Sequence, residues 1–500
     1  MTTKGKEASR PSWMTDGQGY PGRTFPTRIL KTDPEESITF TEASSSQHAG
    51  PSREPLRRAK VEVSSAVTRE ALQLASEAVR ASHIVSFPTE TVYGLGANAL
   101  SATAASRIFA AKGRPADNPL IVHVSDLEML DQLLPTGYEP NRVYKALIKR
   151  FWPGALTLLM PVQAEEAAGP TRRGVPALVR CNLKTLGVRM PSHPLARALI
   201  ATCQVPLAAP SANTSGRPSP TRAEHVYRDM TRIDSTTSDV GGEVQGRLPY
   251  ILDGGPCELG VESTVVDGVT AKGELRVLRP GGISVEAMEE ALEEEGLLAV
   301  GEGMGADEAV RVRVYGRDMA RDKHEEANPT TPGMKYRHYS PDAQVILLVP
   351  FRPDQANGVN PAAGPTKEQA RGTTALALGE SMAQNAPAMP LKEAVTAHVE
   401  RVYREGLGGQ RRPRVGLMSM DNSPLTRSLE DPQLHRFSLG SVDDRHATAA
   451  KRLFDGLRRL DEAEGCDLIF VEAMPDDLGL GLAVMNRLAK AASGTALVEV

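Results

Sequence analysis

Two cationic side chains stand two positions apart in the segment AAKGRPADNPLIVHV (110–124), namely Lys112 and Arg114. They sit on a Gly-Pro turn that cannot bury both of them against a core, so we expect them to project together. Arginine offers a planar pair of donors and lysine a mobile point charge, which together suit a polyphosphate. Asn118 adds a neutral amide. A basic turn alone is as typical of solvated surface as of a phosphate site.

Two further polar clusters follow strand candidates, where sites on open α/β sheets tend to form. In FPTETVYGLGANA (87–99), a strand stops at Pro88 and leaves Thr89 on a turn that two glycines ease. In LAAPSANTSGRPSPTRAEHV (207–226), a Gly/Pro-shaped loop precedes a helix. The amide and hydroxyl side chains of that loop include Ser211, Asn213 and Ser219. Such a loop can hold an anion, although turn chemistry explains each cluster about as well.

The last cluster is ILDGGPCELGVESTVVD (251–267), with Ser263 at the start of a strand and Arg279 at the end of the next. Arg189 also ends a strand and could bind a carboxylate. His123 lies inside an apolar strand, where a lone histidine is more often structural. Taken together, the clusters suit phosphates and a carboxylate, and they include no Cys-His or Ser-His nucleophile pair. They favour phosphoryl or nucleotidyl transfer by positioning and electrostatics.

Alternating strand and helix patterns must position these clusters. Short apolar runs predict strands at 84–87, 120–124, 156–162, 175–180, 206–210, 250–253, 263–267 and 275–278. Helical spacing predicts helices from Thr68, which could be the N-cap, and over 101–111, 141–151 and 284–296. The turn-rich stretch 229–248 reads as a surface insertion. Strands interleaved with helices predict an α/β domain with a buried twisted sheet.

The pattern divides the chain into four parts. Residues 1–60 are rich in Gly, Pro, Ser and Arg and predict a disordered or partly ordered extension. The α/β domain with the clusters spans 61–300, a charged and then Pro-rich linker spans 301–342, and a smaller α/β domain spans 343–500. A long loop is expected at 350–390.

Composition excludes several classes. A net charge of −4 is too small for a polycation that coats nucleic acid, and 4% aromatic residues argue against a base-stacking platform. Four separated cysteines without a CxxC pair argue against a disulfide framework or zinc site. No apolar run reaches the ~20 residues that span a bilayer, so no membrane is expected. These features favour the cytoplasm. Arginines near the N-terminus are also compatible with a minor form of the protein that is targeted to mitochondria.

The motifs, taken in order, resemble those of the YrdC/Sua5 family. They are FPTETVYGLG, AKGRPADNPLIVH, FWPGALT, GVRMPSHP, APSANTSGRPSPT, ILDGG with GVESTVVD, LRPGG and the linker PGMKYRHYSP. The resemblance covers about 67–285 and 330–500 and points to the two-domain Sua5 branch. Relative to this family, 164–175 and 229–248 are expected to be insertions. It implies a YrdC-like twisted open sheet with a concave basic site, a linker, and a smaller Rossmann-like Sua5 α/β domain.

Members of this family are threonylcarbamoyl-AMP synthases. The resemblance thus implies a nucleotidyltransferase that joins L-threonine, bicarbonate or CO₂, and ATP into threonylcarbamoyl-adenylate plus pyrophosphate. Mg²⁺ would be held mainly by the ATP phosphates. The product would pass to a tRNA threonylcarbamoyl-transferase complex, which makes t6A at position 37 of ANN-decoding tRNA.

The resemblance also assigns residues. Those implied to bind ATP are Lys112, Arg114, Asn118, Thr185, Ser211, Asn213, Ser219, Arg279 and Tyr336. Those implied to bind threonine are Thr89, His123, Arg189, Ala209 through its backbone, and Ser263. Lys112 and Arg114 would be catalytic. In the linker, Lys335, Tyr336 and Tyr339 would fold over ATP as a lid. His123, which the pattern alone reads as structural, moves toward a functional role.

Two alternatives remain open on sequence grounds. The basic concavity could bind tRNA or double-stranded RNA through phosphates, with Lys112 and Arg114 serving either purpose. However, Arg189, Ser211 and Ser263 indicate a small-ligand pocket. A carbamoyl-adenylate enzyme with another carbamoyl donor, as in maturation proteins that share this domain, would be expected to add a zinc finger, and this chain has no CxxC.

Overall fold

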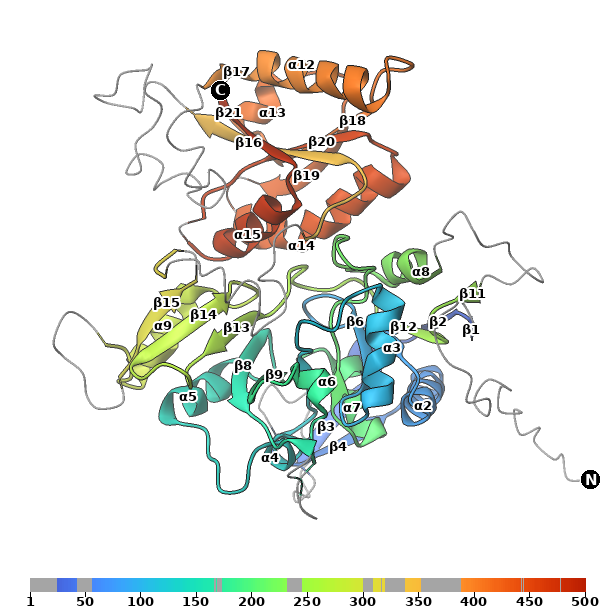
Figure 1. The fold of residues 1–500 in the computed structure, drawn as a ribbon, viewed down its shortest axis with the longest axis vertical. Coiled ribbons are helices and arrows are strands. Elements are labelled where there is room, and N and C mark those ends of the chain that lie inside the picture. The colour runs from blue at the N-terminus through green and yellow to red at the C-terminus, as the bar shows by residue number, and fades with distance from the viewer. Residues whose placement is uncertain are drawn as a thin grey trace, which may run out of the picture.

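The protein folds into two α/β domains in a computed structural model, in which the second domain lies over one side of the first (Figure 1). The structure describes residues 25–42, 56–165, 168, 173–231, 245–299, 309–315, 317–319, 338–351, 388–441, 443, 445–476 and 478–500. Most of the long loop expected at 350–390 lies outside these residues. So do 166–167, 169–172 and 232–244, which belong to the two expected insertions.

The first domain is built on a mixed sheet of 11 strands. In spatial order they are β15 (Arg311–Val314), β14 (Glu274–Arg279), β13 (Thr264–Asp267), β8 (Leu156–Pro161), β9 (Thr185–Arg189), β7 (Val122–His123), β10 (Leu207–Ala208), β6 (Gly94–Asn98), β5 (Val85–Phe87), β12 (Tyr250–Asp253) and β2 (Arg28–Lys31). Two small pairs accompany it: β1 (Phe25–Pro26) with β11 (Gln245–Gly246), and β3 (Ile38–Glu42) with β4 (Ala59–Val63).

Helices pack on this sheet around one apolar core. They are α1 (Pro34–Ser37), α2 (Ala66–Arg80), α3 (Ala102–Lys112), α4 (Leu127–Leu133), α5 (Arg142–Phe151), α6 (Ala177–Arg180), α7 (Pro194–Cys203), α8 (Ala223–Thr231) and α9 (Val285–Glu294). Polar side chains cap several of them, as predicted for Ser284 before α9. This scaffold fixes the strand ends that carry the polar clusters.

The second domain has a parallel sheet of 6 strands. Their order is β17 (Met389–Pro390), β21 (Gly494–Glu499), β16 (Gln344–Phe351), β20 (Leu468–Glu472), β18 (Val415–Asp421) and β19 (His435–Ser441). Its helices are α12 (Leu391–Arg401), α13 (Pro424–Ser428), α14 (Arg445–Arg458) and α15 (Gly481–Ala491), with π-helical turns at Val402–Gly406 and Arg459–Ala463. Helices cover both faces, which matches the expected Rossmann-like arrangement.

The two faces of the second sheet have separate cores. Residues of α12 and α13 pack with one face, and residues of α14 and α15 with the other. Helices α14 and α15 are turned toward the first domain (Figure 1). Val92 and Val261 of the first domain belong to the same apolar cluster as α14 and α15, so the core continues across the interface.

Buried ion pairs reinforce this interface. Arg458, at the end of α14, is fully buried and donates to Asp229 of α8 at 2.8 Å and to the carbonyl oxygen of Pro218 at 2.6 Å. Arg217 contacts Asp461 at 3.2 Å and Glu462 at 2.8 Å. The second domain is therefore fastened directly to the loop that follows β10.

Some sequence predictions of local structure are wrong. The N-cap of α2 is Ser65, whose side chain accepts from Thr68 N, whereas the Thr68 hydroxyl donates to Asp33. The stretch 175–180 carries the short helix α6 instead of a strand. Gly94 and Gly96, which were expected to ease the turn after Pro88, belong to strand β6 instead. Gly96 has no side chain there, which leaves room for the Phe87 ring.

The strands also cross the expected domain limits. Strand β2 pairs with β12 although it lies within 1–60, and β15 pairs with β14 although it lies in the expected linker, 301–342. Asp229, placed at the start of an exposed insertion, is a buried residue of α8. None of the helices in the described ranges combines the length and apolar character needed to cross a membrane.

Candidate active site

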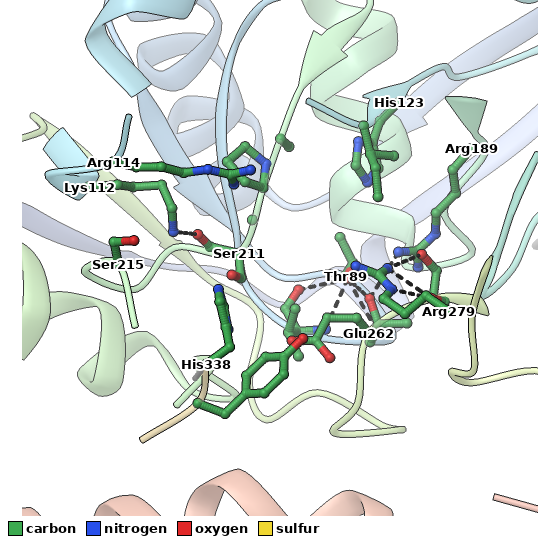
Figure 2. A pocket seen from close by; sticks show the side chains of 18 residues that line it. Thr89, Lys112, Arg114, His123, Arg189, Ser211, Ser215, Glu262, Arg279 and His338 are labelled. Carbon is green, nitrogen blue, oxygen red and sulfur yellow. Dashed lines mark hydrogen bonds between the residues drawn. The ribbon is translucent and has the colours of Figure 1, made fainter. Parts of the chain in front are cut away.

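One pocket of the first domain gathers most of the predicted polar residues (Figure 2). It encloses about 660 Å³ when the open solvent at its mouth is included. Its walls are Thr89, Thr91, Val92, Gly94, Lys112, Arg114, Ile121, His123, Arg189, Ala209, Pro210, Ser211, Ser215, Glu262, Ser263, Arg279, His338 and Tyr339.

Lys112 is the last residue of α3, and Gly113 ends the helix in the left-handed conformation. The lysine is buried, and its Nζ donates to the carbonyl oxygens of Ser211 at 2.5 Å and Asn213 at 2.6 Å. Burial, and next the charge of Arg114, lower its pKa to about 7. Lys112 therefore lies among main-chain carbonyl oxygens and does not project freely into solvent beside Arg114.

Arg114 stays partly exposed and lines the same wall as Lys112, Ser211 and Ser215 (Figure 2). Its Nη2 donates to the carbonyl oxygen of Asn118 at 3.4 Å. The Ser211 hydroxyl donates to Asn213 Oδ1 at 2.5 Å. This half of the pocket therefore offers two cations and hydroxyl groups to an anion.

Arg189 ends β9 on the other side of the pocket and is buried. It forms an ion pair with the equally buried Glu90, and it donates to Thr91 Oγ1 and the Gly154 carbonyl oxygen, each at 3.0 Å. Thr89 Oγ1 lies 2.7 Å from Thr91 Oγ1. The sequence pattern left Glu90 without a role, yet Glu90 fixes the arginine that we expected to bind a carboxylate.

His123 lies beside Arg189, since β7 and β9 pair in parallel with these two residues opposite each other. It is buried, and within the described residues its Nδ1 has no hydrogen-bond partner. Burial, with the charge of Arg189, lowers the pKa of its imidazole to about 3. A neutral imidazole with an unpaired nitrogen in a pocket wall is poorly explained as a structural residue.

Ser263 and Arg279 come from neighbouring strands, just before β13 and at the end of β14. Arg279 Nη2 donates to the Ser263 carbonyl oxygen at 2.8 Å and to its Oγ at 3.1 Å. Ser263 Oγ also lies 2.7 Å from Thr157 Oγ1. Burial lowers the pKa of Arg279 to about 10, which leaves the guanidinium charged at neutral pH.

Glu262 also lines the pocket, although the sequence pattern did not single it out. Its Oε1 accepts from the Ser219 hydroxyl at 2.5 Å, and its Oε2 accepts from Arg487 of α15 at 3.0 Å. Burial alone would raise the pKa of this carboxyl, but Arg487 and Arg279 hold it at about 2. The position of Glu262 next to Ser263 in the motif GVEST could have indicated that it belongs to the site. Its partner Arg487, however, lies 225 positions away in the sequence.

Two residues of the linker complete the wall, His338 and Tyr339. Tyr339 is buried with its ring centroid 5.2 Å from that of Phe454 in α14, and His338 lies edge-on to it at 4.3 Å. Sequence reasoning placed Tyr339 near the nucleotide and overlooked His338. Lys335 and Tyr336 lie outside the described residues.

Four predicted residues do not line the pocket. Asn213 and Ser219 lie directly behind it, where they hold Lys112, Ser211 and Glu262 through the contacts above. Asn118 is buried and meets Arg114 through its carbonyl oxygen. Thr185 begins β9 four residues before Arg189, about 13 Å along the strand at ~3.3 Å per residue.

The chain matches two family models. Residues 77–281 match the model described as "Telomere recombination", whose name joins Sua5, yciO and yrdC. Residues 283–493 match the model described as the C-terminal domain of threonylcarbamoyl-AMP synthase. Together they cover both domains of the structure.

Full-length relatives and solved structures agree with these matches. Threonylcarbamoyl-AMP synthase of Schizosaccharomyces pombe is 38% identical, over 88% of this chain and 93% of the relative, and that of Bacillus subtilis is 37% identical, over 84% and 92%. The crystal structure of Pyrococcus abyssi Sua5 complexed with L-threonine is similar with a TM-score of 0.59 and 34% identity, covering 86% of this chain and 96% of that one.

Proposed function

The chain belongs to the YrdC/Sua5 family of threonylcarbamoyl-AMP synthases, and from that premise we propose that its pocket joins L-threonine, bicarbonate or CO₂, and ATP into threonylcarbamoyl-adenylate and pyrophosphate. The product serves the t6A modification of tRNA. The observation that carries the proposal is the assembly of four cationic side chains and one neutral histidine around a single pocket. These cations are Lys112, Arg114, Arg189 and Arg279.

The pocket divides into two halves that suit the two larger substrates. Lys112 and Arg114, with the Ser211 hydroxyl, face the space for the ATP phosphates. Buried charges with fixed partners need little reorganisation when a phosphate arrives, which is the usual source of electrostatic stabilisation. Arg279 lies across the pocket from Lys112 (Figure 2), where it donates to Ser263, and it would contact the nucleotide from there.

Threonine occupies the half around Arg189. The guanidinium of Arg189 binds the carboxylate, since Glu90, Thr91 and Gly154 already fix its orientation. His123 Nδ1 offers an unpaired nitrogen to the amino acid, and Thr89 with Ser263 supplies hydroxyl groups. The Ala209 backbone completes this half.

The reaction then needs two steps. The threonine amine attacks the carbon of CO₂ or bicarbonate, which forms an N–C bond and gives a carbamate; a proton is lost when CO₂ reacts, and a water molecule when bicarbonate reacts. A carbamate oxygen next attacks the α-phosphorus of ATP, and the bond to pyrophosphate breaks. Lys112 and Arg114 hold the phosphates in line and offset the charge of the leaving pyrophosphate.

Mg²⁺ would be held mainly by the ATP phosphates. In the part of the chain that the structure describes, no group of three His, Cys, Asp or Glu side chains lies close enough to hold a metal ion. The pocket carboxylate of Glu262 is already hydrogen-bonded to Ser219 and Arg487. The ion would add positive charge where pyrophosphate leaves.

The described end of the linker, His338 and Tyr339, would help to exclude water from the pocket, which protects a labile carbamate and adenylate. His338 and Tyr339 are the described residues that support this role, since they line the pocket while Tyr339 packs on Phe454 of the second domain. The enzyme works in the cytoplasm, and its product passes to a tRNA threonylcarbamoyl-transferase complex.

Mass spectrometry of the products tests the proposal. Purified full-length chain is incubated with L-threonine, bicarbonate, ATP and Mg²⁺, and threonylcarbamoyl-adenylate is expected in amounts equal to the pyrophosphate released. Omission of threonine is the control, and it should leave ATP intact. If no adenylate forms, while the protein binds tRNA in a filter assay, the RNA-binding interpretation replaces this one.

A further inference from the structure

Arg487 of α15 is a second-domain side chain that reaches the wall of the pocket. It is almost fully buried, at 1% exposure, and its Nε donates to Glu262 Oε2 at 3.0 Å. Its Nη1 donates to the carbonyl oxygen of Pro280, next to Arg279. Its guanidinium carbon lies 5.9 Å from the centroid of the Tyr339 ring. Arg487 therefore touches three neighbours of the site from outside the first domain.

Its partner Glu262 is in an unfavourable place for a carboxylate. It lines a pocket whose proposed ligand is a polyphosphate, and like charges in a desolvated site repel strongly. The first domain supplies Arg279 and the Ser219 hydroxyl to this carboxylate. Only Arg487, among the described residues, forms an ion pair with it. Without Arg487, a buried negative charge would face ATP with its main counter-charge removed.

We propose that Arg487 is a positioning residue of the ATP site: by holding and neutralising Glu262, the docked second domain sets the charge and shape of the pocket wall. This inference rests on the proposed function, because it needs ATP to be the ligand. It gives the second domain a task beyond anchoring the linker. ATP binding is then strongest when α15 is seated against the first domain.

The competing interpretation is that Arg487 only fastens the two domains. The two differ in what Glu262 does when Arg487 is lost. If Arg487 offsets the charge of Glu262, the damage comes from the carboxylate and removing its charge repairs it. If Arg487 only docks α15, a neutral residue at position 262 repairs nothing.

The experiment measures binding of a non-hydrolysable ATP analogue with Mg²⁺ by calorimetry, together with kcat and KM for ATP. Arg487→Met is expected to weaken binding at least about tenfold, the equivalent of 1.4 kcal/mol. The loss should fall mainly on KM. Adding Glu262→Gln to this variant should restore binding to within about threefold of the wild-type value, because glutamine can still accept from Ser219.

The matched control is Arg222→Ala, which removes an interdomain ion pair with Asp455 at 3.1 Å whose arginine is about half exposed and lies outside the pocket wall. It should leave ATP binding unchanged. Equal weakening in Arg487→Met and in the double variant would overturn the proposal, while an active wild-type enzyme keeps the proposed function intact. An inactive wild-type would reject that function instead.

A third variant allows the proposal to be tested even if Arg487→Met does not fold. Arg487→Lys retains a positive charge beside Glu262 but cannot bond to Glu262 and the Pro280 carbonyl oxygen at once through the two nitrogens of a planar fork. Analogue binding within about threefold of wild type supports charge neutralisation. A loss of about tenfold or more in this folded variant, which keeps the positive charge, means that neutralising Glu262 is not what sustains ATP binding and contradicts the proposal.

Discussion

The ammonium of Lys112 donates to the main-chain carbonyl oxygen of Asn213 at 2.6 Å, which ties the end of α3 to the loop after β10. The backbone N–H of Ser215 returns a bond to the Lys112 carbonyl oxygen at 2.9 Å. Arg458 of α14 bonds to the same loop through the Pro218 carbonyl oxygen. Helix α3, this loop and α14 therefore fix the position of Lys112. This prearranged charge is the basis of the first two predictions.

Lys112→Ala should reduce kcat/KM for ATP by at least about 100-fold, because the pocket loses a fixed charge that faces the phosphates. The variant should fold, since alanine fits the end of α3 and the released carbonyl groups can bind water. Pyrophosphate release and circular dichroism measure the two outcomes. Lys149→Ala, an exposed lysine on α5, is the control. A near-normal rate in Lys112→Ala would remove the lysine from the mechanism.

ATP binding should weaken as the pH rises above 7. Burial places the pKa of Lys112 at about 7 in the free enzyme, so the ammonium loses its proton from neutral pH upward. Bound phosphates favour the charged form, so binding takes up a proton, and affinity should fall up to about tenfold per pH unit. His123, with a pKa of about 3, and Arg279, with one of about 10, titrate outside this window.

Calorimetry with a non-hydrolysable ATP analogue and Mg²⁺ at pH 7, 8 and 9 measures this effect. Lys112→Ala is the comparison, and its weaker affinity should hardly change over the range. A wild-type affinity that is constant from pH 7 to 9 would mean that Lys112 stays charged in the free enzyme, or does not meet the phosphates.

Arg458→Ala should cost about 3–5 kcal/mol of folding free energy, because it leaves the buried carboxylate of Asp229 without its main partner. Thermal or urea unfolding measures the loss. Arg228→Ala is the control, since that arginine is exposed and its contact with Glu462 at 3.2 Å is worth at most about 1 kcal/mol. Equal stability of the two variants would show that the Asp229 pair does not fasten the domains.

Much of this architecture could be predicted from the sequence, because strands and helices follow local apolar patterns. The strand ends at Arg189 and Arg279, and the capped helix after Ser284, lie where their patterns place them. The series of motifs along the chain also identified most of the residues that line the pocket. Local patterns failed where packing decides, as at β6, where a glycine-containing strand forms because Gly96 makes room for the Phe87 ring.

Contacts between distant segments left no local signal. Glu262 and Arg487 are 225 positions apart, and nothing near either residue indicates that they meet. The buried state of Lys112 was also unpredictable, because its partners are main-chain carbonyl oxygens, which any residue type provides. Sequence reasoning thus identified residue types suited to the ligands and missed the groups that hold them.

Gly281→Ala should damage the pocket without changing any polar group. A Cβ at this position would lie 2.3 Å from the carbonyl oxygen of Glu262 and 2.4 Å from the backbone N of Thr264, closer than real contacts allow. Backbone cannot move aside as a flexible side chain can, so the segment with Glu262 and Ser263 must shift. Such overpacking costs about 1–3 kcal/mol, and it should raise KM for both ATP and threonine.

Steady-state kinetics and thermal unfolding of this variant check both effects. Gly406→Ala is the matched control, because there the nearest atom to an added Cβ is a Val402 methyl at 3.6 Å, an ordinary contact far from the pocket wall. Its stability should change by less than about 0.5 kcal/mol. If Gly281→Ala keeps both KM values while losing stability, then Glu262 and Ser263 tolerate displacement, and the close approach of the two backbones serves the fold rather than the site.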